Sequence, residues 1–258
     1  MEITRKFKWW LIVGVGLVIC IIGASTFILQ KHVGLPLSAS EIRSLAKAGE
    51  DGDAEACWAL YLYYVDNKKE EAYWLQKAAG YGYAEAQEHL AARLRFGPDN
   101  ETRLKALKLM EKAAAQNYAG AQQALAFWYR DGTIVERNLK TFEYWTRKAA
   151  TNGLIPAMLD LAKFLLDTHD TYGALVEAYK WTTIASTRAG SESGYAIRAR
   201  RTQDQIAEKA LKIGLDVPEL TRDAESQAVK LVGQIPVDID PIKAQSILLK
   251  RIREKYGK

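Results

Sequence analysis

The chain has 258 residues, of which 48% are hydrophobic and 26% are charged, and it contains only 6 prolines, a composition typical of a folded protein. Its formal net charge is +5, and residues 1–8 carry +2 of it, so the remainder is too small an excess for the dense basic face that nucleic acid requires. Cys20 and Cys57 are the only cysteines, too few to indicate a disulfide framework or a redox compartment.

An uncharged run of 21 residues extends from Trp9 to Leu29, long enough to cross the hydrocarbon layer of a bilayer as a helix. Arg5, Lys6 and Lys8 precede this run, and flanking basic residues stay on the cytoplasmic side of the membrane. We therefore expect residues 1–8 to be a cytoplasmic arm, 9–29 a transmembrane anchor in a bacterial inner membrane, and 30–38 a tether that leads to a periplasmic domain.

Two other fates of this segment stay open. A cleaved secretory signal would use the small residues 23–25, although the apolar core of such a signal is usually shorter, about 7–15 residues. A lipoprotein signal would modify Cys20, but Ile19 occupies the preceding position, where a small residue is required. The length of the run favours the uncleaved anchor.

A small-residue triplet recurs along the chain, three positions after a large apolar residue. The triplets are Lys77-Ala78-Ala79, Lys112-Ala113-Ala114, Lys148-Ala149-Ala150 and Ile184-Ala185-Ser186, after Trp74, Leu109, Trp145 and Trp181. Their starts are 35, 36 and 36 residues apart, and a fixed period in this range is the signature of a helical repeat array. The expected fold is all-α, a solenoid of helical hairpins preceded by one transmembrane helix.

The first helix of each unit carries a second set of matches in the same register. A leucine follows the opening small residues by four positions, at Leu60, Leu90, Leu125 and Leu161. Alanines at 91, 126 and 162 follow in units two to four, and we expect them to let neighbouring helices approach closely. Gly80, Asn117 and Gly153 are expected to end the second helices, because these residues tolerate the left-handed cap conformation.

The third unit shows the pattern most clearly, and residues 119–153 read AGAQQALAFWYRDGTIVERNLKTFEYWTRKAATNG. It resembles the Sel-1-like repeat (SLR) family, relatives of the tetratricopeptide repeats with small-x-small, Leu-small-x-x-Tyr, a glycine-containing loop and Trp-x-x-Lys-Ala-Ala-x-x-Gly. The resemblance covers about residues 46–190 and implies a solenoid that binds protein. Bacterial members act as adaptors, and some envelope members are immunity proteins against antibacterial effectors, phospholipases among them.

Residues 39–190 are expected to form this array, as a half-unit cap followed by four units. The first and fourth units depart from the pattern, as end units often do. The period stops after Gly190, and we expect residues 191–258 to form a C-terminal helical cap with helices at about 195–213, 218–232 and 240–256.

No catalytic pattern is present in the sequence. The three histidines, at 32, 89 and 169, are scattered, and the chain has no His-x-x-x-His, Cys-x-x-Cys, Gly-x-Ser-x-Gly or phosphate-binding glycine loop. We therefore expect a protein that is not an enzyme and that holds no cofactor and no metal.

Large apolar residues on the first helices are the candidates for partner contact, because exposed aromatic side chains are typical interface anchors. The residues are Trp58, Leu62, Tyr63, Phe127 and Trp128. They stand at positions that the repeat does not need for its own core. One match opposes this hypothesis, since Phe164 of the fourth unit aligns with Trp128 and Tyr63 and makes that position a core candidate.

The function that these features favour is a membrane-anchored periplasmic repeat protein that binds another protein. In its finer form, suggested by the resemblance, the protein is an immunity protein that neutralises a secreted phospholipase-type effector. The alternatives are a non-enzymatic envelope scaffold for a cell-wall or polysaccharide enzyme complex, and a glycan binder.

Overall fold

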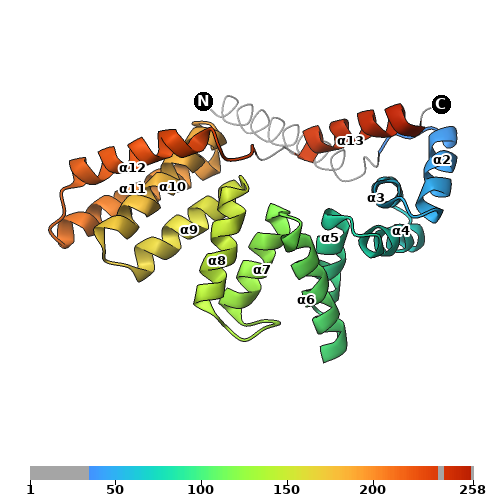
Figure 1. The fold of residues 1–258 in the computed structure, drawn as a ribbon, viewed down its shortest axis with the longest axis horizontal. Helices are drawn as coiled ribbons and strands as arrows, with labels where there is room; N and C mark the ends of the chain where they lie inside the picture. The colour runs from blue at the N-terminus through green and yellow to red at the C-terminus, as the bar shows by residue number, and fades with distance from the viewer. Residues whose placement is uncertain (1–34, 238–240, 257–258) are drawn as a thin grey trace, which may run out of the picture.

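The computed structural model describes residues 35–237 and 241–256, which fold into 12 α-helices without a strand (Figure 1). The helices are α2 (Ala39–Glu50), α3 (Ala54–Tyr63), α4 (Lys68–Gly80), α5 (Ala84–Leu94), α6 (Asn100–Ala115), α7 (Ala119–Asp131), α8 (Leu139–Thr151), α9 (Ile155–Thr168), α10 (Tyr172–Ala189), α11 (Gly194–Lys212), α12 (Val217–Val232) and α13 (Pro241–Tyr256). None of these helices is long and apolar enough to span a membrane. The transmembrane helix expected at 9–29 lies outside the described residues.

The helices from α3 to α10 form four hairpins that stack into an arc, with α2 packed against α3 at one end and α11 and α12 packed on α10 at the other (Figure 1). We call the hairpins α3–α4, α5–α6, α7–α8 and α9–α10 units one to four. The expected all-α solenoid is confirmed for the described residues. The three helices expected after Gly190 begin and end within one residue of the observed α11, α12 and α13.

The turn that joins one unit to the next has the same geometry at four places. Its central residue has a positive φ, +102° at Gly52, +94° at Gly82, +63° at Asn117 and +96° at Gly153. In each turn the backbone N–H of this residue and that of the next donate to carbonyls near the end of the preceding helix, the pairing that closes a helix in a Schellman motif. The expectation for Gly80 was wrong, because Gly80 still lies in α4 and Gly82 is the left-handed residue.

The alanines expected at close helix contacts are confirmed, since Ala91, Ala126 and Ala162 are each 0% exposed. The tryptophans of the second helices differ more than their alignment predicts. Trp74 and Trp181 are buried, whereas Trp145 is half-buried against its core. The apolar interior is divided into three clusters along the arc rather than one central core.

A buried glutamine joins successive units at equivalent positions of α5 and α7. Gln122 Nε2 donates to the carbonyl of Ala114 at 3.0 Å, and its Oε1 accepts from Asn152 Nδ2 at 2.8 Å. Gln87 makes the matching pair of bonds with Ala79 and Gln116, at 3.3 and 2.9 Å. Each glutamine therefore satisfies a buried carbonyl at the end of one unit and is held by a side chain of the next.

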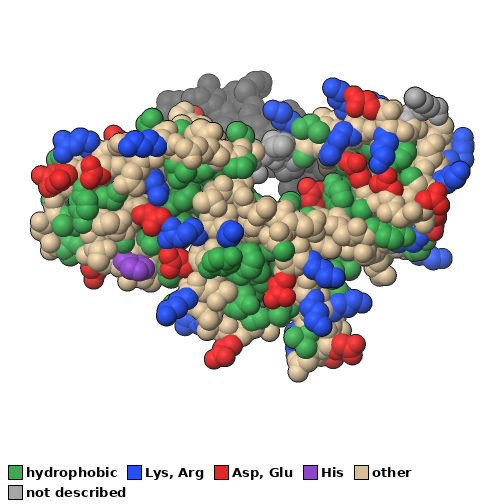
Figure 2. Space-filling view, in the orientation of Figure 1, with side chains coloured by type: hydrophobic (Ala, Val, Ile, Leu, Met, Phe, Trp, Pro, Cys, Tyr) green, Lys and Arg blue, Asp and Glu red, His purple; other side chains and the backbone are tan. Residues whose placement is uncertain are grey.

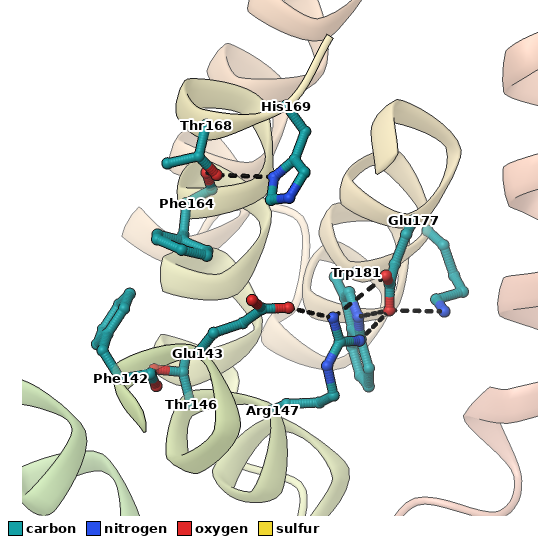
Figure 3. Close-up of polar contacts among 10 residues, drawn as sticks. Phe142, Glu143, Thr146, Arg147, Phe164, Thr168, His169, Glu177 and Trp181 are labelled. Carbon is teal, nitrogen blue, oxygen red and sulfur yellow. Dashed lines mark hydrogen bonds and ion pairs between the residues drawn. The ribbon is translucent and has the colours of Figure 1, made fainter. Parts of the chain in front are cut away.

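An ion cluster joins α8 and α10, the second helices of units three and four (Figure 3). Arg147 lies 2.8 Å from Glu143 and also pairs with Glu177, which accepts from Trp181 Nε1 at 3.4 Å. Burial alone would raise the pKa of Glu177, but the hydrogen bond and charge of Arg147 lower it. The carboxylate therefore stays ionised between the two helices.

The last helix does not stay with α11 and α12. Instead α13 lies against α2 and α3 at the opposite end of the arc (Figure 1). Leu248 and Ile252 of α13 are 4% and 1% exposed and share the cluster formed by Leu45 and Leu60. The described chain thus brings its C-terminal helix back to its first unit.

Candidate functional site

The structure distributes the five candidate anchors over three separate places. Trp58 and Leu62 line a cavity beneath α13, Tyr63 lines a shallow pocket beside Leu35, and Phe127 and Trp128 line a cavity at the connections between helices. They therefore do not form one continuous surface.

Trp58 belongs to the core. Its side chain is 5% exposed, and its ring stacks against Tyr61 and Tyr83 at centroid distances of 4.8 and 5.4 Å, with His89 edge-on at 5.1 Å. Burial lowers the pKa of His89, and the Tyr61 hydroxyl lies 3.0 Å from its Nδ1. Trp58 was a candidate partner anchor, and its burial argues against that role, because three neighbouring rings pack against the indole.

The cavity beneath α13 has a volume of about 520 Å³. Residues of α3 and α5, together with Tyr83 before α5 and Tyr118 before α7, form one side of it, and residues between 244 and 251 of α13 form the other. Half-buried Leu62 lies here, together with Glu85, whose pKa is raised by burial. The first-helix face of unit one is thus covered by α13.

Salt bridges from α13 to α2 and α3 surround its apolar contact. Arg251 Nη1 lies 3.2 Å from Glu55 Oε1, Arg253 Nε 3.4 Å from Glu41 Oε1, and Lys255 Nζ 2.6 Å from Asp53 Oδ2. Figure 2 shows basic side chains along α13 with acidic side chains beside them. The helix and the surface beneath it are therefore complementary in charge.

A second cavity, of about 650 Å³, lies where the α5–α6 connection meets α7 and the α7–α8 connection. We call it the loop-edge cavity. Phe96 at its rim is 79% exposed, half-buried Phe127 forms part of its wall, and Trp128 is 3% exposed. The guanidinium groups of Arg95 and Arg130 lie 4.3 and 4.5 Å from the rings of Phe96 and Phe127.

The two aromatic residues of α7 therefore differ in position. Trp128 is buried, which argues against its role as a partner anchor and agrees with the core alternative that its alignment with Phe164 had left open. Phe127 is half-buried, and the Arg130 guanidinium lies over its ring in a cation–π contact, so part of its side chain stays at the surface of the cavity. Hydrophobic side chains gather over α7 and α8 on the face shown in Figure 2.

Tyr63 lies apart from both cavities. It is half-buried, packs edge-on against Tyr64 at 4.8 Å and lines a pocket of about 490 Å³ with Leu35 and Asp66. No group of three or more His, Cys, Asp or Glu side chains that could hold a metal occurs within residues 35–237 and 241–256. Cys57 is buried, and burial raises the pKa of its thiol to about 11, which makes it a poor nucleophile at neutral pH.

Two features of these sites were not predicted from the sequence. Phe96 stands in the segment Arg95-Phe96-Gly97-Pro98, and a large apolar residue between two helices, directly before Gly-Pro, is a signal that could have identified it. The return of α13 has no comparable signal, because the repeat period ends before it.

Comparison with known proteins gives structural likeness alone. No protein-family model matches the chain, and no curated protein matches it. The chain is similar to c5321, a protective antigen of uropathogenic Escherichia coli strains that displays an SLR fold, with a TM-score of 0.59 and 22% identity over 83% of this chain and 43% of that one. This chain has the SLR fold. It is also similar to a Sel1 repeat protein from Oxalobacter formigenes, with 22% identity over 84% of this chain and 100% of that one and a TM-score of 0.49.

The SLR resemblance inferred from the sequence is thereby confirmed at the level of the fold. The chain spans about 43% of the length of the protective antigen. Solenoids of helical hairpins present extended surfaces on which other proteins bind.

Proposed function

We propose that this SLR-fold chain is a non-enzymatic protein-binding solenoid whose partner docks at the loop-edge cavity. The observation that carries the proposal is the 79% exposure of Phe96 beside a cavity of about 650 Å³. Exposed aromatic rings beside a pocket, with arginines at the rim, have the composition of interface hot spots. The partner fitted to this surface carries an apolar side chain for the cavity and carboxylates for Arg95 and Arg103.

The experiment places a photo-crosslinking residue at position 96 of the full chain in its native host. The matched control position is Val229 on α12, which is 75% exposed and lies almost 100 residues after the last residue that lines the cavity. Once the partner is isolated, Phe96→Ala and Phe127→Ala should each weaken its affinity at least tenfold, and Val229→Ala should change it less than twofold. Full affinity in both phenylalanine variants would move the binding surface elsewhere.

The finer proposal is the immunity role, in which the protein neutralises a secreted antibacterial effector from the periplasmic side of an inner membrane. Its support is the SLR fold together with the absence of catalytic motifs from the sequence. Cells that carry Phe96→Ala at normal protein level should be sensitive to the effector, whereas Val229→Ala cells should be protected. A partner that proves to be a cell-wall or polysaccharide enzyme would favour the scaffold alternative, and one that proves to be a glycan would favour the third.

A further inference from the structure

We propose that α13 is a tethered ligand, and that the face of α2, α3 and α5 beneath it is a second docking groove whose occupant is a basic amphipathic helix. We call this face the acidic groove. It is distinct from the loop-edge cavity, and its test does not depend on the function proposed above. In this structure the protein's own C-terminal helix occupies only part of the groove.

The apolar contacts of α13 follow the periodicity of one helix face. Leu248 and Ile252 are buried, and Tyr256, one turn further, is half-buried and donates its hydroxyl to Asp53. Apolar residues at i, i+4 and i+8 are the pattern of a helix that lies in a groove. The residues from 243 to 247 are all exposed, so the helix is held by its C-terminal half.

The acidic residues of the groove favour an occupant with a positive net charge. Between 241 and 256 the helix has five basic residues and one acid, Glu254, and three of the basic residues face Glu41, Asp53 and Glu55 of the array. The pairing with Glu55 is imperfect, because Arg251 lies 3.2 Å from Oε1 while that buried oxygen has no hydrogen bond of acceptable geometry. A helix of the same sign but different sequence could satisfy it better.

The unfilled half of the acidic groove indicates which side chain a more tightly bound helix would carry. Ala244, one turn before Leu248, faces the cavity of about 520 Å³ that Tyr83, His89 and Tyr118 line from the other side. A methyl group at this position leaves the cavity open. A larger apolar residue there would add a third anchor in line with Leu248 and Ile252.

Tethering explains why such a poorly filled contact persists. A segment on a short connection to the array has an effective concentration of the order of millimolar at its own site, so it occupies the groove even when its intrinsic affinity is weak. A separate helix can bind only by displacing α13, which makes α13 a gate on the first-helix face of unit one.

The experiment uses a fluorescein-labelled synthetic peptide of residues 241–258 as the probe and measures its anisotropy with the full chain. The full chain carrying Leu248→Ala and Ile252→Ala should bind the probe at least tenfold more tightly than the unmodified chain, because its own helix no longer competes. The control Lys250→Ala changes a side chain of α13 that is 79% exposed and should leave binding as in the unmodified chain. Circular dichroism and urea unfolding show whether the array stays folded.

A second pair of variants tests the groove should the double alanine chain fail to fold. Arg251→Glu with Lys255→Glu keeps the apolar anchors of the full chain and should still raise probe binding several-fold, with an effect that shrinks in high salt. We call a chain in which either pair of substitutions has released α13 the opened chain. A probe with Ala244→Leu should bind the opened chain about threefold to tenfold more tightly than the native probe, since it buries added apolar surface. The control probe, Ser246→Leu, adds the same bulk to another face and should show no gain.

Two results would overturn the proposal. One is a folded, opened chain that binds the probe no more tightly than the unmodified chain. The other is a concentration-dependent dimer of the unmodified chain that becomes monomeric in the double alanine variant, because the occupant would then be α13 of a second copy.

Discussion

Lys255 Nζ lies 2.6 Å from Asp53 Oδ2, so that a salt bridge joins residues 202 positions apart in the chain. Asp53 is also the N-cap of α3, and its Oδ1 accepts from the backbone N–H groups of Glu55 and Ala56 at 3.0 Å each. One carboxylate thus begins the first unit and holds the last helix. The two roles can be separated by substitution.

Asp53→Asn should retain the helix cap and lose the salt bridge, because asparagine caps helices about as well as aspartate does. We expect a loss of less than about 1 kcal/mol in the free energy of unfolding, since Lys255 is largely exposed. Asp53→Ala should lose about 1 kcal/mol more, because it removes the cap as well. Urea unfolding of both variants at low and high salt measures the difference, and equal losses would show that the cap contributes nothing.

Acid should weaken the contact between α13 and the first unit. Burial opposes ionisation of Asp53, but hydrogen bonds from Lys255, Tyr256 and the Ala56 N–H outweigh it and lower its pKa; hydrogen bonds from Ser38 chiefly lower the pKa of Glu41. A pKa that is lower in the folded state contributes stability above the unfolded value, about 4, and loses it as the pH falls through the folded value. The stability difference between the unmodified chain and Asp53→Asn should be constant above about pH 5 and shrink progressively as the pH falls below about 4. A difference that stays the same from pH 7 to the lowest pH at which the chain remains folded would contradict the ion-pair account.

Gln122→Met should destabilise the array although it preserves side-chain volume. The equivalent position in unit four is Met158, which is fully buried, so the shape is tolerated by the fold. In unit three the change leaves the carbonyl of Ala114 and the amide of Asn152 without their partner, which should cost about 1–3 kcal/mol. The control is Gln76→Met on the exposed face of α4, expected within about 0.5 kcal/mol of the unmodified chain. Thermal and urea unfolding compare the two.

Ala126→Leu should cost about 1–3 kcal/mol, because it adds volume at a position that is 0% exposed. The same holds for Ala114 and Ala150, which are 1% and 0% exposed. Lys148→Gln, on the exposed side of α8, should change the free energy of unfolding by less than about 0.5 kcal/mol. Equal destabilisation by the two kinds of change would mean that the repeat register is wrong.

The predicted topology places everything after residue 30 in the periplasm. Alkaline phosphatase fused to the C-terminus should be active, and a reporter that fluoresces only in the cytoplasm should be dark. The opposite pair of results would reverse the orientation, and loss of the first thirty residues from the mature protein would indicate a cleaved signal.

The repeat period sufficed to predict the array because each unit contacts mainly its neighbours. Positions such as Ala91 and Leu125 therefore face similar environments from unit to unit, although Leu90, the equivalent of Leu125 in unit two, is only half-buried. Helix ends were predicted to within a residue or two, and Gly80 was misjudged because Gly82 stands two positions further on and both glycines fit a helix end.

The sites were less predictable because they depend on contacts that do not repeat. Trp58 is buried by Tyr61, Tyr83 and His89, and the last two belong to unit two, directly before α5 and within it. Leu62 lies beneath a helix whose sequence begins almost 180 residues later. Alignment between units carries no information about a contact with a helix outside the repeats. The burial of Trp128, by contrast, was an alternative that its alignment with Phe164 already indicated.

The contact of α13 with the first unit changes the surroundings of the hairpin at that end of the array. A linear stack of repeats unravels from its termini, where a hairpin has a neighbour on one side only. Here α2 and α3 also pack against α13, the described helix that is farthest from them in sequence. An outer hairpin of this array is therefore held from both sides, by its neighbour in the stack and by α13, and the salt bridge between Asp53 and Lys255 is part of the second contact.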